Sequence, residues 1–239
     1  MTTLLKTSLF GLALAGLSSV SLMGQVTILE FDFSGSSSTA DWNTQSSTFN
    51  ASNLQSSSMT RGADISNNNA NNSFRGTGFS NLGIDFTSDR YFEWTVEASP
   101  GFQFTVDSIY GNFNGTATYS NSPGVTMAYA YSLDGGSSFT SMGTFTQVGS
   151  GSQTFNIPVV DQAFLTDVTS VVFRFTASGQ TPTGGWGLQS AASPGTIGLS
   201  MEGTVSAIPE PSTYALIFGS LAFAGLLIRR RIQAKAEKA

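Results

Sequence analysis

Hydrophobic and polar residues alternate along most of the chain. A period of two residues is typical of a strand with one buried face. The alternation recurs in the segments 26–33, 91–97, 102–107, 125–132, 139–146, 153–157, 171–176 and 197–205. Turn sequences such as Ser-Pro-Gly at 99–101 and Asp-Gly-Gly at 134–136 separate several of these segments. The pattern predicts an all-β fold, an antiparallel β-sandwich with jelly-roll-like connections.

The segment 34–73 lacks this alternation. Ser, Thr, Asn and Gln dominate it, and its apolar residues are scattered. Such a composition is typical of a long polar loop rather than of a separate domain. We therefore expect a long loop after the first strand, either as a lid over one end of the sandwich or as a connection without a further role.

The first 24 residues have the order of a secretory signal peptide. Lys6 precedes an apolar run at 9–17, and small residues follow as far as Gly24. Cleavage after Gly24, or at Ser21 as an alternative, would leave a mature chain that begins near Gln25. We predict a signal helix within 1–24 that directs export, with an uncleaved anchor as the alternative.

The last thirty residues combine three features in a fixed order. The run Pro209-Glu210-Pro211 is extended, because proline fixes φ and has no amide donor. The next stretch, 213–228, carries no charge. A helix of that length spans about 24 Å, a little less than the ~30 Å hydrocarbon core of a bilayer. The run Arg229-Arg230-Arg231 follows, which predicts a single transmembrane helix at 213–228 with its arginine end in the cytoplasm.

This combination at the extreme C-terminus resembles the PEP-CTERM sorting signal of exported bacterial proteins. The resemblance implies recognition by an exosortase, a membrane-embedded processing enzyme, with cleavage near the Pro-Glu-Pro triplet. It also implies transient residence in the inner membrane and final localisation at the cell surface or in an extracellular matrix. We accordingly divide the chain into a signal peptide (1–24), a β-sandwich domain (25–208) and a sorting tail (209–239), with a simple unprocessed anchor as the alternative for the tail.

The composition of the segment 25–208 restricts its chemistry. It contains no Cys, His or Lys, and its four arginines and thirteen acidic residues give a net charge of −9. A surface this acidic repels nucleic acid phosphates and anionic lipid. Without His or Cys, nucleophilic catalysis by Ser-His or Cys-His pairs is excluded, and the main ligands of zinc, copper and iron are missing. Without disulfides, the stability of the domain must come from its core.

Residues 132–139, with the sequence Ser-Leu-Asp-Gly-Gly-Ser-Ser-Phe, resemble an Asp-box, a hairpin motif of secreted β proteins. Asp134 is expected to accept hydrogen bonds from turn amides, the two glycines to supply positive φ, and Phe139 to anchor the hairpin to the core. The motif occurs once, so it predicts a structural turn and excludes a propeller.

Acidic residues offer two further kinds of site. Glu93 and Glu97 share one strand face, but they lie about 13 Å apart along the strand, too far for a catalytic pair. Catalysis would therefore need a carboxylate from another strand. Calcium is favoured over catalysis, because it prefers carboxylate and amide oxygens. The candidate calcium ligands are Glu30 and Asp32 in the first strand and Asp85 and Asp89 in a second cluster.

A carbohydrate-binding surface needs exposed aromatic rings beside polar groups, because sugar C–H faces stack on rings while amides and carboxylates bind the hydroxyls. Trp186, in the sequence Gly-Gly-Trp-Gly, is the first candidate as an exposed loop residue. Tyr110 and Tyr119 flank an Asn-rich segment that is predicted as a second polar loop. Trp94 falls on the apolar face of its strand and is expected in the core.

Together these features predict an exported, non-enzymatic surface protein. We expect a structural or adhesive role at the cell surface or in the extracellular matrix, with polysaccharide contact as its mechanism and Ca²⁺ as the one candidate cofactor. The expected partners are the exosortase, extracellular polysaccharide and, through the tail, the membrane, but not nucleic acid. Two alternatives stay open: a secreted polysaccharide-active enzyme with paired carboxylates, and a surface coat protein that only self-associates.

Overall fold

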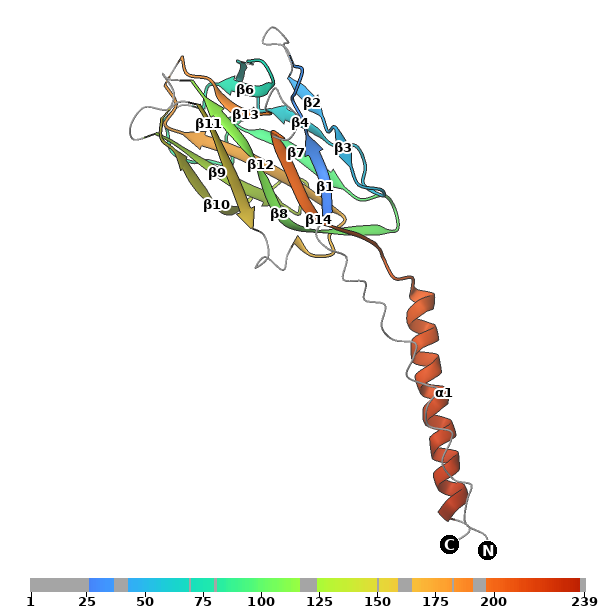
Figure 1. Ribbon diagram of the computed structural model, residues 1–239. Coiled ribbons are helices and arrows are strands. Elements are labelled where there is room, and N and C mark those ends of the chain that lie inside the picture. Colours follow the sequence, from blue (N-terminus) through green and yellow to red (C-terminus); the bar gives the residue numbers. More distant parts are fainter. Residues whose placement is uncertain are drawn as a thin grey trace, which may run out of the picture.

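Two antiparallel β-sheets form the body of the protein, and one long helix follows them (Figure 1). The computed structural model describes residues 26–36, 43–68, 70–79, 81–116, 124–149, 151–158, 165–181, 183–190 and 197–236. The predicted signal peptide at 1–24 lies outside these residues. All strand pairs in the described part of the chain are antiparallel, which confirms the predicted all-β sandwich.

The larger sheet has eight strands. In spatial order they are β3 (Phe49–Asn50), β1 (Val26–Phe31), β14 (Leu199–Ala207), β8 (Phe102–Gly115), β13 (Trp186–Gln189), β6 (Ser73–Thr77) and β5 (Ser66–Asn67), with β11 (Gly151–Pro158) paired to β8 off this path. The 14-residue strand β8 organises the sheet. One of its edges pairs with β14 and then with β13, and part of the other pairs with β11.

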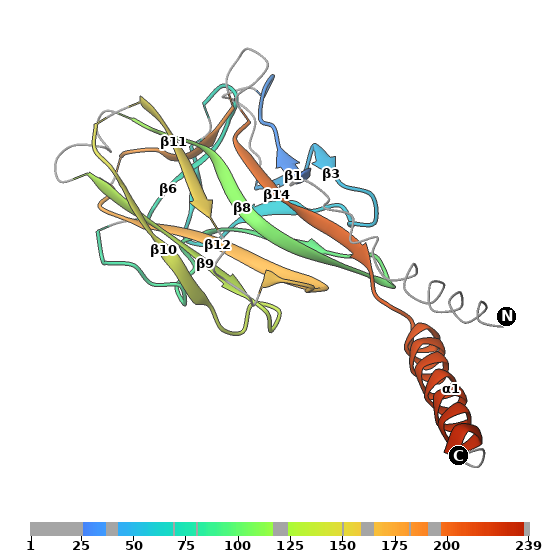
Figure 2. The same ribbon diagram turned by 60° about the horizontal axis from the view of Figure 1, so that its bottom comes forward.

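The smaller sheet has six strands. In spatial order they are β10 (Thr140–Gln147), β9 (Val125–Ser132), β12 (Ser170–Ser178), β7 (Phe92–Glu97), β4 (Ser58–Arg61) and β2 (Thr44–Ser46). Figure 2 shows the two sheets as separate layers, with β8 and β14 in one and β9, β10 and β12 in the other. Each sheet therefore has an inner face toward the core and an outer face away from it.

Aromatic side chains from the two inner faces fill the space between the sheets. Trp186 of β13 stacks on Phe113 of β8 and on Phe92 of β7, with ring centroids 4.8 and 5.7 Å apart. Phe79 meets the same indole edge-on at 5.0 Å. All four side chains are buried. Full burial of a large apolar side chain contributes about 1.5–3 kcal/mol, so these contacts join the two layers where no disulfide does.

The predicted alternation is confirmed in the strands that build this core. Leu29 and Phe31 of β1 are buried, whereas Glu30 between them is half-buried. Trp94 of β7 is buried, as expected for a core residue. Each of the eight alternating segments overlaps a strand. The strands β6 and β13 were not predicted, because each is short and contains a glycine that interrupts the pattern.

The prediction of a long polar loop at 34–73 is wrong. The segment contains β2, β3, β4, β5 and the start of β6, which extend both sheets. Three of its scattered apolar residues, Leu54, Met59 and Ile65, are buried in the core. Its polar residues also take part, since the buried Ser57 donates its hydroxyl to the carbonyl of Thr95 at 2.5 Å. The segment is therefore part of the sandwich and not a lid over it.

The helix α1 (Pro211–Ala236) follows β14 after a short exposed connector at 208–210. Pro211, which was expected in the extended segment, is instead the first residue of the helix, a position that suits the fixed φ of proline. Figure 1 shows it projecting away from the sheets. Its large apolar side chains are exposed, among them Leu216 and Phe223. In the described part of the chain, no helix is both long and apolar enough to cross a membrane. The segment 213–228 is thus helical as predicted, but its role as a transmembrane span is not confirmed.

The burial of Met59 provides a test of this correction. Met59→Ala should lower the free energy of unfolding by about 2–5 kcal/mol, because it leaves a cavity in a shared core. The measurement is urea unfolding of the purified protein. Leu82→Ala, at a side chain that is 80% exposed, is the control and should change stability by no more than about 0.5 kcal/mol. If both substitutions change the free energy of unfolding equally little, the segment 34–73 is not packed against the core, as the loop prediction had it.

Candidate functional site

Trp186, the first predicted glycan contact, is a core residue. It lies in β13, not in a loop, and its side chain is fully buried among aromatic rings of both sheets. A ring enclosed in this way cannot present a face to a sugar. The assignment of glycan contact to Trp186 is therefore wrong, and its Gly-Gly-Trp-Gly sequence serves close strand packing instead.

Tyr110, the second candidate, lies on the outer face of the eight-stranded sheet. It belongs to β8 rather than to a loop, and its neighbours Ile109 and Gly111 are buried while Tyr110 itself is half-buried. The side chain therefore stands on the face opposite the core. Tyr119 lies outside the described residues.

A row of polar positions crosses the sheet at Tyr110. In register, Glu30 of β1 stands opposite Ser200 of β14, Ser200 opposite Tyr110, and Tyr110 opposite Asn156 of β11. Adjacent strands are about 4.8 Å apart, so the strand of Glu30 lies about 10 Å from that of Tyr110. The fold thus brings a predicted calcium ligand and a predicted glycan contact, 80 residues apart in the sequence, onto one face.

Further polar side chains extend this face on both sides of the row. Ser108 donates its hydroxyl to Glu202 Oε2 at 3.0 Å, and the Asn112 amide donates to the carbonyl of Gln189 at 3.1 Å. Ser108 and Asn112 are both buried, although they point away from the core. We name the outward-facing residues Glu30, Ser108, Tyr110, Asn112, Asn114, Ser200 and Glu202 the polar face.

Arg75 of β6 reaches the polar face from its far side. Its Nη1 donates to Asn114 Oδ1 at 3.0 Å across β13, where the intervening residue is Gly187. A Cβ on Gly187 would collide with the Phe74 carbonyl and lie 2.6 Å from Arg75 Cα. Glycine therefore makes room for the backbone of β6 and for the side-chain stem of Arg75. Arg75 is 7% exposed, and burial lowers the pKa of its guanidinium.

The pKa values of Glu30 and Asp32, at the β1 end of the polar face, are shifted in opposite directions. Burial, and secondarily the charge of Asp32, raises the pKa of Glu30. Burial also opposes ionisation of Asp32, but hydrogen bonds from the amide and hydroxyl of Ser34 outweigh it and lower the pKa of Asp32. The hydroxyl of Ser190 adds to this lowering. The two neighbouring carboxyl groups therefore do not titrate alike.

The second predicted calcium pair lies elsewhere. Asp85 accepts the amide and hydroxyl of Thr87 at 2.8 and 2.7 Å, and these bonds lower the pKa of Asp85. The carbonyl of Asp89 accepts the amide of Asp64 at 3.1 Å. Asp85 and Asp89 belong to the segment 81–91, which packs on the six-stranded sheet, and not to the polar face. Among the described residues no group of three or more acidic side chains forms a candidate metal site, and calcium binding stays a prediction.

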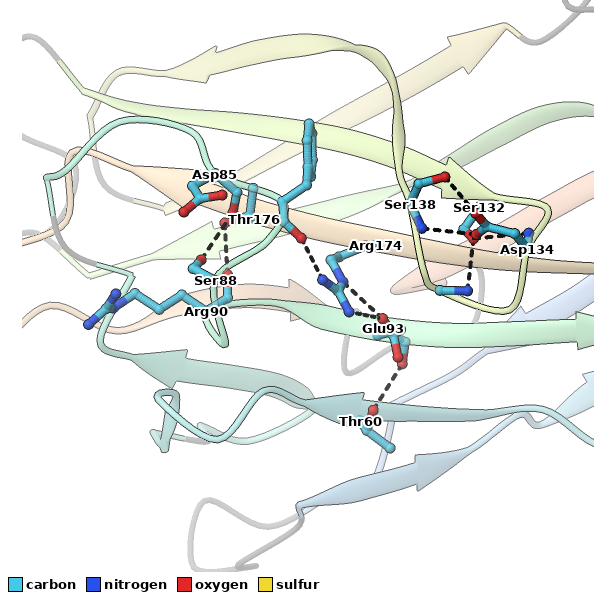
Figure 3. Close-up of polar contacts among 12 residues, drawn as sticks. Thr60, Asp85, Ser88, Arg90, Glu93, Ser132, Asp134, Ser138, Arg174 and Thr176 are labelled. Carbon is cyan, nitrogen blue, oxygen red and sulfur yellow. Dashed lines mark hydrogen bonds and ion pairs between the residues drawn. The ribbon is translucent and has the colours of Figure 1, made fainter.

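Arg174 closes the outer face of the six-stranded sheet (Figure 3). Its guanidinium lies between the rings of Tyr91 and Phe139, at 3.8 and 4.0 Å from their centroids. Its Nε and Nη2 both donate to Glu93 Oε2, at 2.8 and 2.5 Å, and its Nη1 donates to the carbonyl of Phe86 at 2.5 Å. Each of the three guanidinium nitrogens donates a hydrogen bond, so this cluster has a structural role.

The segment 81–91 is held over β12 at three successive outward positions. Besides Arg174, the Thr176 hydroxyl donates to the carbonyl of Arg90 at 2.7 Å, and the amide of Gly83 donates to the Ser178 hydroxyl at 3.0 Å. These contacts cover the outer face of the smaller sheet at β12. Glu93, one of the acids considered for catalysis, forms an ion pair with Arg174, while Glu97 on the same strand is exposed.

The Asp-box hairpin forms as predicted around Asp134 (Figure 3). Its carboxylate accepts the Ser132 hydroxyl at 2.6 Å and both the amide and hydroxyl of Ser138 at 2.9 and 2.6 Å. Gly135 and Gly136 have positive φ, as the turn requires. The expected role of Phe139 needs a correction: it is half-buried and stacks on Arg174 on the outer face, not in the core.

Comparison with known proteins does not identify a family: no protein-family model and no curated protein matches this chain. The interpretation of the polar face therefore depends on its own residues. Sequence reasoning missed Ser108, Ser200 and Glu202 as parts of this face, and it missed Arg75 beside it. A signal for β8 was present in the alternation of 108–114, but the partners on β6 and β14 become neighbours only through the sheet order.

The hydrogen bonds to Asp134 predict a pH-dependent contribution to stability. Those from Ser132 and then Ser138 hold the pKa of Asp134 below its ordinary value of 3.8. A lowered folded-state pKa stabilises the protein above the unfolded-state pKa, and the effect is lost as the pH falls through the folded-state value. Asp134→Asn should therefore lower the thermal midpoint at pH 7, and the difference from the wild type should shrink below about pH 3.8.

Thermal unfolding followed across pH 2–8 measures this contribution. The matched control is Glu97→Gln, an exposed acid on β7, whose midpoint should stay closer to that of the wild type at neutral pH. A midpoint difference for Asp134→Asn that is constant with pH would contradict the assignment.

Proposed function

We propose that this chain is an exported surface protein, a non-enzymatic, jelly-roll-like sandwich that contacts extracellular polysaccharide through its polar face and is sorted by its C-terminal tail. The observation that carries the proposal is Tyr110. It is an aromatic ring on an outer sheet face, half-buried and surrounded by hydroxyl, amide and carboxylate side chains. Such a set suits a sugar, whose C–H face stacks on the ring while its hydroxyls bind the polar groups.

The charge distribution favours a neutral glycan. Between Ser108 and Val160 the only charged residue is Asp134, so β8 and β11 are uncharged from Ser108 onward. The rest of the segment 25–208 is acidic, and its field repels polyanions. A neutral polysaccharide meets no such repulsion at Tyr110. An acidic polysaccharide would need a bridging cation, and Ca²⁺ is the one that the oxygen-rich surface suits.

The tail supports export by the PEP-CTERM route. Pro209 and Glu210 are exposed in the connector between β14 and α1, where a processing enzyme has access. The helix beyond them exposes leucine and phenylalanine side chains, which calls for an apolar partner. An exosortase within the membrane would provide an apolar environment for this helix. Arg229 and Arg230 on the helix suit the cytoplasmic side of the membrane.

Replacement of Pro209, Glu210 and Pro211 by alanine tests the tail. In a bacterium with an exosortase, the wild type should leave the membrane fraction with a mass reduced by the tail, because the triplet marks the cleavage site. The alanine variant should keep its full tail and stay with the membrane. Ser220→Ala within α1 is the control and should be processed. Equal processing of all three proteins would contradict the sorting role of the triplet.

Tyr110→Ala tests the polar face. Loss of one stacking ring should weaken binding to the producer's extracellular polysaccharide about 3- to 10-fold, while Tyr110→Phe retains the ring and most of the affinity. The control is Leu82→Ala, an exposed apolar side chain in the segment 81–91 over the other sheet, which should leave binding unchanged. The measurement is co-sedimentation or calorimetry with the polysaccharide. Unchanged binding of Tyr110→Ala would remove this face from the proposal.

One observation keeps a polysaccharide-active enzyme as the second candidate. Glu30 and Glu202 stand on neighbouring strands at diagonal positions of the polar face, and such positions are about 7–8 Å apart. Burial raises the pKa of Glu30, as a general acid requires. The same binding assay separates the candidates when reducing ends are counted. Release of reducing ends that is lost in Glu202→Gln would favour the enzyme over the binding protein.

A further inference from the structure

The sandwich leaves one side open. The eight-stranded sheet ends in β3 and β5, each of two residues, and the six-stranded sheet ends on one side in β2, of three residues. Very short edge strands are one way in which native proteins prevent pairing with other chains. The remaining side carries β10 and β11, which have eight residues each. Figure 2 shows them on the side of the molecule away from β1 and β3.

The strand β10 lacks two common protections of an edge strand, charged residues and proline. Its sequence from Thr140 to Gln147 contains no charged residue and no proline. Most of its residues are exposed, and within the described ranges only β9 pairs with it. A β-bulge lies between Ser141 and Gly143, and five successive paired residues follow it, from Gly143 to Gln147. A long, neutral edge of this kind is a template for another strand.

Apolar side chains border the same edge. Met142 and Phe145 of β10 are half-buried and pack against the core, so the core reaches the surface at this strand. A strand added beside β10 would cover these two side chains. Backbone pairing and burial of apolar area would then favour the same contact.

The charge pattern indicates which partner fits. The segment 25–208 carries a net charge of −9, yet Asp134 is the single charge between Ser108 and Val160. That stretch forms β9, β10, β11 and most of β8, so it makes up the open side. The carboxylate of Asp134 is engaged in its own hairpin. Two copies of an otherwise acidic protein meet the least repulsion when these neutral sides face each other.

We infer that β10 is a homotypic interface, at which two copies of this chain pair their β10 strands antiparallel and join their six-stranded sheets. An antiparallel strand pair is self-complementary about a twofold axis, so each copy presents the same residues to the other. The opposite edge, β2, is too short to repeat the contact, and the assembly therefore closes as a dimer. This inference depends neither on glycan contact nor on the sorting tail.

Disulfide trapping in the full chain tests the interface, because the natural sequence contains no cysteine. Thr144→Cys and Thr146→Cys place a thiol on the exposed part of β10, and Thr95→Cys places one on the interior strand β7, also exposed. Paired strands bring such residues within about 7 Å, the Cα limit for a disulfide. Under mild oxidation in detergent, at least one β10 variant should form covalent dimers several-fold more than Thr95→Cys does. If neither Thr144→Cys nor Thr146→Cys forms more covalent dimer than Thr95→Cys does, the proposal is overturned.

A second variant tests the interface without a cross-link. Thr144→Lys adds a charge at an exposed position, so the fold is retained, but two such charges face each other across the dimer. Its sedimentation mass should fall from dimer to monomer, whereas Thr95→Lys, the matched control on β7, should remain a dimer. A dimer that persists in Thr144→Lys, or a wild type that sediments as a monomer, would contradict the inference.

Discussion

The indole of Trp186 lies between Phe113 of its own sheet and Phe92 of the facing sheet, and Phe79 meets it edge-on. The chain has no cysteine, so contacts of this kind must hold its two layers together. They also fix the order of the strands around β13, and with it the outer positions of β8. The polar face around Tyr110 is therefore a consequence of how the rings pack on the inner side.

The two outer faces of the sandwich differ in how far other segments of the chain cover them. On the six-stranded sheet, Arg174 binds Glu93, two rings and a carbonyl, and the segment 81–91 covers the strands. Around Arg174 this face is therefore covered by its own chain. On the eight-stranded sheet, Glu30, Tyr110 and Glu202 of the polar face keep part of their surface exposed, although Ser200 between them is buried. This contrast, together with the neutral open side at β10, is why we propose surface contact as the function.

Much of the fold could be predicted from the sequence, because the strands with one buried face alternate clearly. The segment 34–73 could not, since its strands are short and polar, and residues such as Met59 are buried singly rather than in an alternating series. The site was predicted in part. Tyr110 and Glu30 were identified as separate candidates, but their common face depends on β14 lying between β1 and β8, which no local pattern encodes. Trp186 was misplaced because glycines around a ring suit tight packing as well as a loop.

The central claim is that the polar face, and not the face closed by Arg174, meets polysaccharide. Hydroxyl-radical footprinting of the protein, with and without the producer's extracellular polysaccharide and with and without a calcium chelator, tests it directly. The account predicts that the polysaccharide protects Tyr110 from modification and leaves Tyr91 and Phe139 as reactive as before. Loss of protection on chelation would add calcium to the mechanism. Protection of Tyr91 and Phe139 with Tyr110 unchanged, or no protection at any of these rings, would contradict the account.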